Sequence, residues 1–276
     1  LRDKFNVVFK TNTKVFGNHE PPKDEGDHFI KNTVNLKDIV EQSDAVLITT
    51  GTWQSRRLKI PGENGPSVMS AVEYLYEIRA WEKGLLDHHP HVGDRVIVIG
   101  GGLSAVDAAL EALEQGAKEV ILAYRRTKKQ APAGIYEINS LIRKGVKWME
   151  LVSPVEIVRK NEKVKGIKLQ KMKLGEPDES GRPRPIPIPG SEFVLEVDTV
   201  IEAVGEIATP PLVNDFLGIK LDRKNRIIVD EHYRTTNPKV WAAGDVVTGP
   251  SFIGNAVKTG LYAAKSIHIH LSNKLL

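Results

Sequence analysis

Glycines at a strand-to-helix turn are the first residues in this sequence that could do chemistry. Gly100, Gly102 and Ala105 form the pattern GxGxxA, which follows the apolar run 95–100 and opens a segment of helical spacing. Glycines permit a tight turn and let a pyrophosphate approach the backbone, where the amides at a helix start bind it. We therefore predict a dinucleotide site that includes Ser104. The alternative is a tight turn that binds no ligand.

Two arginines occupy the place where such a site usually carries an acidic residue. That residue accepts hydrogen bonds from the adenosine ribose and lies roughly 20 residues beyond the turn; the count from Ala105 reaches Arg125. A guanidinium cannot accept these bonds, but it donates to the oxygens of a phosphate. Arg125 and Arg126 therefore favour NADP(H) over NAD(H). A solvated basic loop is the alternative.

Strands and helices must alternate to position this turn. Apolar runs predict strands over 44–52, 95–100, 119–125 and 198–205, and helical spacing predicts helices over 67–84, 103–115 and 135–145. Ser67 or Ser70 could cap the first of these helices. The alternation indicates an α/β fold with a parallel sheet. Further strands are expected at 6–15, 146–160, 163–174, 226–235 and 239–245, a proline-rich loop at 175–193, and a last helix from about Asn255.

Composition narrows the class of protein. The chain has 276 residues, and its net charge of +4 comes from 39 basic and 35 acidic residues without a basic tract. This excess is too small to indicate nucleic-acid binding, and no apolar run approaches the roughly 18 residues of a membrane span. We therefore expect a soluble cytoplasmic protein that binds neither nucleic acid nor membrane. The absence of cysteine leaves no disulfide, iron–sulfur ligand or CxxC pair, and no metal site is predicted.

Six segments occur in an order that resembles a known family. They are DAVLITTGTWQSRRLKIPGE, the GGG turn, YRRT, LGEPDESGRPRPIPIPGSEF, VDTVIEAVG and NPKVWAAGDVVTGPSFIGNAVKTGLYAA. The chain resembles the small subunit of NADPH-dependent glutamate synthase and related flavin reductases with two dinucleotide-binding domains. The likeness extends over nearly the whole chain, and LGEPDESGRPRP is its most distinctive segment.

The resemblance implies a second cofactor, FAD. Asp245 in the AAGD segment would accept a hydrogen bond from the ribitol, and Gly244 would let the backbone approach it. Ala256 and Val257, near the start of the last helix, would direct its amide end toward the flavin pyrimidine, where reduction builds negative charge. The remaining matched residues are Gly51 and Thr52 beside the FAD and Gly205 at the return from the NADP(H) domain.

The implied architecture is an NADP(H)-binding domain, 67–205, inserted between two pieces of a partial FAD-type domain, 1–66 and 206–276, with a small antiparallel meander. The implied reaction passes hydride from NADPH to FAD and names no catalytic side chain. Electrons would then leave to iron–sulfur centres or to a partner such as the large glutamate synthase subunit or ferredoxin. The alternatives are an NADPH:ferredoxin or other acceptor oxidoreductase subunit, and a non-catalytic cofactor-binding or assembly subunit.

One part of the family pattern is missing from this sequence. Members begin with a cysteine-rich region for iron–sulfur clusters, followed by a strand with its own GxGxxG for FAD, and neither occurs here. We therefore expect a chain that is truncated at its N-terminus. The lack of a dithiol also argues against an end point like that of thioredoxin reductase.

Overall fold

The computed structural model describes residues 2–18, 24–178 and 181–273. It divides into two compact units. Residues 55–205 form the inserted unit, and residues 1–54 with 206–276 form the outer unit. The connecting segments, β4 (Gln54–Ser55) and β13 (Glu206–Ile207), pair as a short two-stranded sheet.

The first boundary lies earlier in the chain than the expected residue 66. The segment 55–66 packs within the inserted unit, where Pro61 O accepts a hydrogen bond from Ile157 N at 2.9 Å. Gly62 O accepts another from Arg159 Nε at 2.7 Å. These long-range contacts, which no local pattern in 55–66 signals, assign the segment to the inserted unit.

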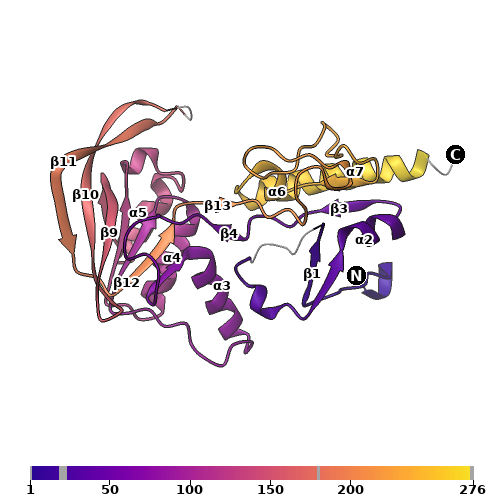
Figure 1. Ribbon diagram of the computed structural model, residues 1–276. Helices are drawn as coiled ribbons and strands as arrows, with labels where there is room; N and C mark the ends of the chain where they lie inside the picture. The colour runs from indigo at the N-terminus through magenta and orange to yellow at the C-terminus, as the bar shows by residue number, and fades with distance from the viewer. Residues whose placement is uncertain (1, 19–23, 179–180, 274–276) are drawn as a thin grey trace. The chain divides into compact units, whose positions relative to one another are not determined.

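A five-stranded parallel sheet forms the centre of the inserted unit (Figure 1). Its strands, in spatial order, are β5 (Val68–Ser70), β12 (Thr199–Ala203), β6 (Arg95–Gly100), β7 (Glu119–Tyr124) and β8 (Lys147–Glu150). Each neighbouring pair runs parallel. β6 and β7 are almost continuously apolar because both faces of the sheet are covered. The expected parallel sheet around the glycine turn is therefore confirmed.

Helices cover one face of this sheet: α3 (Ala71–Glu82), α4 (Leu103–Glu114) and α5 (Ile135–Arg143). Tyr74 and Ile78 of α3 are wholly buried against Val98 and Leu122 of the sheet. Ser70 is the cap of α3, because its Oγ accepts a hydrogen bond from Glu73 N at 3.0 Å. The helix thus begins at one of the two serines that the sequence offered.

A three-stranded antiparallel meander covers the other face of the sheet. It consists of β9 (Val152–Lys160), β10 (Lys163–Pro177) and β11 (Pro183–Leu195), with β10 in the middle. Ile157 and Ile167 of the meander pack against Ile97 and Ile121 of the sheet. The inserted unit therefore has three layers, with the parallel sheet between the helices and the meander.

The proline-rich segment forms strand β11, so the expectation of a loop at 175–193 is wrong. Proline has no N–H to donate, but an edge strand leaves alternate backbone positions without a neighbour. β11 pairs with β10 alone, and Pro185 and Pro187 lie opposite Leu174 and Met172 in the register. The alternation of the prolines thus fits the free edge of the meander.

The outer unit contains two short parallel pairs of strands. β1 (Thr13–Phe16) pairs with β2 (Asn32–Asn35), and β3 (Val46–Ile48) pairs with β14 (Val240–Ala242), which is far away in the sequence. The helices are α1 (Arg2–Phe5), α2 (Leu36–Gln42), α6 (Asp245–Thr248) and α7 (Ile253–Asn273). A core that includes Leu36, Ile48, Ile219 and Val240 joins both pieces of this unit.

Two of the expected strands in the outer unit are largely irregular. The segment 226–235 makes only isolated bridges, Ile227 with Leu221 and Arg234 with Trp241, and the expected strand 6–15 is reduced to β1. Both sequences alternate apolar and polar residues, but in the described residues no long neighbouring strand pairs with them. None of the helices in the described ranges is long and apolar enough to cross a membrane.

Candidate dinucleotide and flavin sites

The three glycines of the turn face three different surroundings. A Cβ on Gly100 would lie 2.3 Å from Ala203 O, and one on Gly101 would lie 2.6 Å from the ring of Tyr124. These two glycines are therefore required by the packing of the protein itself. A Cβ on Gly102 would meet no atom within 4 Å. Its smallness leaves room for a ligand to approach the backbone at the start of α4.

The start of α4 suits an anion. Gly102 is the N-cap residue of this helix, no side chain caps it, and its first turn contains no acidic residue. The amides of the first turn and the positive end of the helix dipole therefore point toward the open side of Gly102. Ala105 is wholly buried where the helix packs closely on the sheet, and Ser104 lies half-buried in the first turn. The four residues predicted from GxGxxA are thus brought together.

The two arginines after β7 have different surroundings. Arg125 is exposed, whereas Arg126 is 2% exposed. Arg126 Nε donates to Pro183 O at 2.7 Å, and its Nη2 lies 2.6 Å from Asp178 Oδ2. Arg126 thereby fastens the end of the β10–β11 hairpin to the carboxyl edge of the parallel sheet. The sequence prediction treated both arginines alike; in the structure only Arg125 presents its side chain to solvent beside the turn.

Other cations lie near Arg125. Desolvation lowers the pKa of Arg125, and the charges of Arg126 and Arg182 lower it further, whereas Tyr124 and Asp178 act in the opposite direction. Cations in close proximity repel one another, so a multiply charged anion placed among them relieves the repulsion. The surroundings of Arg125 therefore favour a phosphate group over a neutral hydroxyl.

The residues matched to an FAD site gather at one edge of the outer unit. β3 and β14 are adjacent and parallel, so the turns that follow them, with Gly51 and Gly244, leave the same carboxyl edge. Both glycines have positive φ, 75° and 74°. Gly51 O, next to Thr52, accepts a hydrogen bond from Thr209 N at 3.1 Å. Ligands of α/β sheets bind at this kind of edge.

The AAGD turn is held by the helix that follows it. Gly244 N donates to Thr259 Oγ1 of α7 at 3.0 Å, and a Cβ on Gly244 would lie 3.9 Å from Ala256 Cβ. Asp245 Oδ1 accepts a hydrogen bond from Ser251 Oγ at 3.2 Å. Val257, one residue after Ala256, is 55% exposed. Gly205 belongs to the inserted unit instead, where it follows β12 by two residues and its carbonyl accepts a hydrogen bond from Arg56 N at 2.8 Å.

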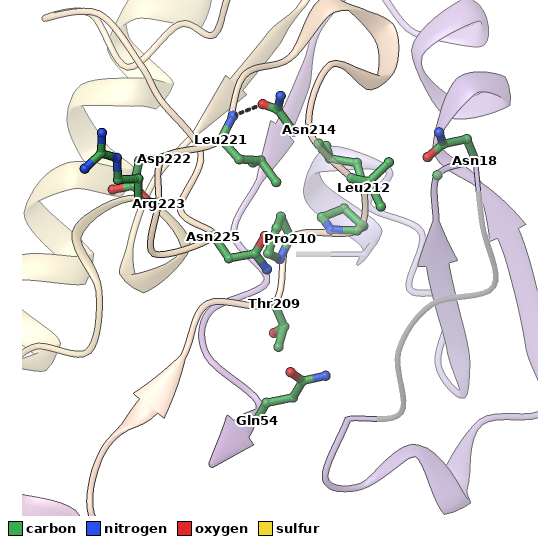
Figure 2. Close-up of a pocket in the computed structure, with 13 residues that line it drawn as sticks. Asn18, Gln54, Thr209, Pro210, Leu212, Asn214, Leu221, Asp222, Arg223 and Asn225 are labelled. Atoms are coloured by element: carbon green, nitrogen blue, oxygen red, sulfur yellow. Dashed lines mark hydrogen bonds between the residues drawn. The ribbon is translucent and has the colours of Figure 1, made fainter. Parts of the chain in front are cut away.

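A pocket in the outer unit was not predicted from the sequence. It has a volume of about 430 Å³ and opens where the chain leaves the carboxyl end of β1 (Figure 2). Asn214 Oδ1 accepts a hydrogen bond from Leu221 N at 2.8 Å and so joins two loops of its wall. Its lining, part of which Figure 2 labels, includes Gly17, Asn18, Gln54, Thr209, Pro210, Leu212, Leu221, Asp222, Arg223 and Asn225. The only sequence signal for it is the glycine that directly follows β1.

Two carboxyl groups meet inside the inserted unit, which the sequence also did not indicate. Glu202 on β12 is 1% exposed and Glu63 is 8% exposed. Arg57 Nε lies 2.8 Å from Glu202 Oε2 and 3.4 Å from Glu63 Oε1. Neither oxygen of Glu202 has an aligned donor among the described residues, whereas Lys59 N donates to both oxygens of Glu63.

A shared proton accounts for this geometry. Burial raises the pKa of Glu202 to about 8, and Glu63 contributes to the rise against the charge of Arg57. Burial also opposes ionisation of Glu63, but hydrogen bonds from Glu202 and from the Lys59 amide lower its pKa overall. At neutral pH Glu202 is therefore the protonated partner and donates to the ionised Glu63.

Comparison with known proteins agrees with the fold. The family model described as pyridine nucleotide-disulphide oxidoreductase matches residues 6–260. The chain belongs to this family. Members bind FAD and NAD(P)H. The glutamate synthase [NADPH] small chain of Halomonas elongata is 36% identical over 240 residues, which cover 84% of this chain and 51% of that protein.

Two further comparisons extend this result. The NADP(+)-dependent formate dehydrogenase subunit beta of Moorella thermoacetica is 36% identical over 242 residues, which cover 86% of this chain and 33% of that protein. The chain therefore spans about half or less of the length of these curated relatives. FprA of Mycobacterium tuberculosis, solved in complex with NADPH, has the same fold, with a TM-score of 0.67 and 24% identity over 87% of this chain and 66% of that one.

Proposed function

We propose that the inserted unit binds NADPH and the outer unit binds FAD, in an oxidoreductase of the glutamate synthase small-chain type. The observation that carries this proposal is the open side of Gly102 at the uncapped start of α4. Packing explains Gly100 and Gly101, but nothing in the described protein explains why position 102 is a glycine. A pyrophosphate bound to the first-turn amides supplies that reason.

Arg125 selects the nucleotide in this proposal. Its guanidinium is exposed after β7, where the adenosine ribose of a dinucleotide on the GGG turn would lie. A 2′-phosphate accepts hydrogen bonds from it, whereas the hydroxyl of NADH is bound best by an acceptor, and Arg125 can only donate. Arg126 supports the site indirectly, because its hydrogen-bonding groups hold the hairpin.

Part of an FAD site is proposed in the outer unit, which lacks the second GxGxxG of the family pattern. Gly244 and Gly51 offer backbone with positive φ at one sheet edge, and the carboxylate of Asp245 lies beside them as an acceptor for a ribitol hydroxyl. Ala256 and Val257 would present the start of α7 to the flavin. When bound, FAD supplies the acceptor for the hydride of NADPH and can release electrons one at a time. The protein binds and orients both groups, and no side chain is assigned as an acid or base.

A partner subunit would receive the electrons. The relatives named above are a small chain and a beta subunit, and another relative, of Geobacter sulfurreducens, is an NADPH-Fe(3+) oxidoreductase subunit beta, 35% identical over 71% of this chain. An acceptor reductase other than glutamate synthase is therefore the second candidate. Both readings use the same NADPH and FAD sites and differ in the partner alone.

Binding measurements test the proposal. We expect the purified chain to bind NADPH more tightly than NADH in calorimetric titrations, and Arg125→Ala to remove at least about tenfold of this preference, because one charge-assisted contact is lost. Lys173→Ala, which removes an exposed charge from β10, is the matched control and should leave the preference intact. Equal affinity of the wild type for both nucleotides, or no binding of either, would refute the proposed cofactor.

A further inference from the structure

We propose that Arg57 is a further binding residue of the NADP(H) site and that its terminal nitrogens donate to the nicotinamide–ribose half of the nucleotide. This inference rests on the proposed function, because it assumes that the pyrophosphate binds at the GGG turn. The residue comes from the segment that precedes the parallel sheet. The order of the strands, the path of this segment and the orientation of one guanidinium carry the inference.

The order of the strands places the second half of the nucleotide at β12. In the sheet, β12 lies on one side of β6 and β7 lies on the other, and Ala203 of β12 is opposite Gly100 in the register. A dinucleotide binds across the carboxyl ends of such strands, where the strand order changes direction. With the pyrophosphate at Gly102 after β6 and the 2′-phosphate at Arg125 after β7, the nicotinamide half extends over the carboxyl end of β12.

The segment that contains Arg57 runs along this end of β12. Arg56 N donates to Gly205 O at 2.8 Å, and a Cβ on Gly205 would lie 3.5 Å from Arg56 Cδ. Glu202 is the last residue but one of β12, and its Oε2 lies 2.8 Å from Arg57 Nε. All of these residues belong to the inserted unit. Arg57 therefore lies at the same carboxyl edge of the sheet as the glycine turn.

The guanidinium of Arg57 meets two carboxyl groups with the same nitrogen. Its shortest contacts with Glu202 and Glu63 are both made by Nε, at 2.8 and 3.4 Å. Within the described ranges, neither Nη1 nor Nη2 donates a hydrogen bond. The side chain is 37% exposed, although both carboxyl partners are buried. Four of the five N–H donors of a guanidinium are on the terminal nitrogens, so most of its donors are left for a ligand.

Two buried carboxyl groups hold Arg57 in this orientation. The side chains of Glu202 and Glu63 are 0% and 9% exposed, and Lys59 N donates to both oxygens of Glu63 at 3.1 Å. A buried carboxylate needs a counter-ion, because an unpaired charge in the interior is costly. Nε of Arg57 meets this need and is therefore not available to a ligand. The terminal nitrogens are.

The charge of this group decides which acceptor fits it. At neutral pH Glu202 keeps its proton and Glu63 is ionised, so the two carboxyl groups carry one negative charge together. Arg57 balances that charge, and little net positive charge is left to attract another phosphate. Neutral acceptors therefore suit the terminal nitrogens. The nicotinamide–ribose half of NADP(H) offers two kinds, the ribose hydroxyls and the carboxamide oxygen.

Calorimetric titrations of the full chain with three probes test this assignment. The probes are 2′,5′-ADP, which is the adenosine half, 2′-phospho-ADP-ribose, which adds the second ribose, and NADP⁺, which adds nicotinamide. We expect Arg57→Ala to weaken NADP⁺ binding about tenfold, the effect of one charge-assisted hydrogen bond at a partly exposed residue. Binding of 2′,5′-ADP should not change, which also shows that the variant is folded. Lys59→Gln removes an equal charge from an exposed side chain of the same segment and should change NADP⁺ affinity less than about twofold.

The outcomes separate this inference from the proposed function. A loss for NADP⁺ alone assigns Arg57 to the carboxamide oxygen, and a loss for 2′-phospho-ADP-ribose as well assigns it to the second ribose; both support the inference. An equal loss for all three probes, or an equal loss in Lys59→Gln, overturns it. Unchanged NADP⁺ affinity in Arg57→Ala also overturns it, and the proposed function then stands. If the wild type binds none of the probes, the proposed function itself fails.

A second variant separates ligand binding from the role of Arg57 as a counter-ion. Arg57→Lys keeps the positive charge beside Glu202 and Glu63, but its single nitrogen is occupied by the carboxyl groups. We therefore expect Arg57→Lys to recover, in urea unfolding, the stability that Arg57→Ala loses, while its NADP⁺ affinity stays as weak as that of Arg57→Ala. Recovery of both stability and affinity would show that any cation suffices here and would overturn the assignment of the terminal nitrogens.

Discussion

Glu202→Gln should abolish the loss of stability that ionisation of Glu202 causes as pH rises from 4.5 to 8. The folded protein keeps Glu202 protonated up to about pH 8, whereas an unfolded glutamate ionises near its ordinary pKa of 4.5. Between these two values the folded state holds one proton more than the unfolded state. The free energy of unfolding therefore falls as pH rises through this window, by about 1.4 kcal/mol per pH unit for one proton. Glutamine has no proton to lose, so the variant lacks this contribution.

The difference in unfolding free energy between wild type and Glu202→Gln depends on pH. Below pH 4.5 both states protonate Glu202, and wild type and variant should have similar stability. As pH rises toward 8, the wild type loses stability relative to Glu202→Gln, until the variant is the more stable protein. Glu63 does not cancel this slope, because its pKa is lowered and its proton difference lies below 4.5. Near pH 8 the variant is more stable than the wild type by a few kcal/mol at most, because Arg57 Nε, at 2.8 Å from Glu202 Oε2, favours the ionised form of Glu202 in the wild type.

Urea unfolding followed by far-ultraviolet circular dichroism at several pH values measures this difference. The other titrating groups act on wild type and variant alike, so the difference in slope isolates Glu202. Glu176→Gln changes an exposed glutamate on β10 and should leave the slope as it is in the wild type. Parallel stability curves for wild type and Glu202→Gln between pH 5 and 8 would refute the shared proton and show that Arg57 keeps Glu202 ionised.

Three further predictions concern the glycine turn and a helix cap. Gly100→Ala should destabilise the protein by about 1–3 kcal/mol in thermal or urea unfolding, because its Cβ would meet Ala203 O at 2.3 Å. Gly102→Ala meets no atom within 4 Å and has an unstrained φ of −91°, so stability should hold while nucleotide affinity falls on the order of tenfold; a matching loss of stability would contradict this. Ser70→Ala should cost about 1 kcal/mol through loss of the cap on α3, and Ser70→Asp should retain most of it.

The parts that the sequence predicted are those whose pattern is local. The apolar run 95–100, the glycines after it and the helical spacing of 103–115 lie within a single unit of strand, turn and helix, and the structure has each of them. The cap of α3 is also local, since it depends on the conformation of Ser70 and its hydrogen bond to Glu73 N. Buried parallel strands, the start of a capped helix and a glycine turn between strand and helix can therefore be predicted from a single sequence.

What the sequence did not reveal depends on distant partners. Nothing around Arg126 shows that its acceptors, Pro183 O and Asp178, come from a hairpin about fifty residues later. The proline run 183–189 was expected to be a loop because proline opposes sheet structure in general, and only the position at an edge permits the strand. Glu202 lies in an apolar strand, where its partner Glu63 is invisible from the sequence. In each case a tertiary contact changed the role of the residue.

Arg126 shows how these two kinds of information combine. Its position after β7 predicts a phosphate ligand, and its burial assigns it instead to the hairpin that carries Arg182. Because Arg126 directly follows Arg125, a change that releases Arg126 from Asp178 and Pro183 O should also alter the position of Arg125. The role of Arg126 thus follows from its tertiary contacts and not from its place in the YRRT segment.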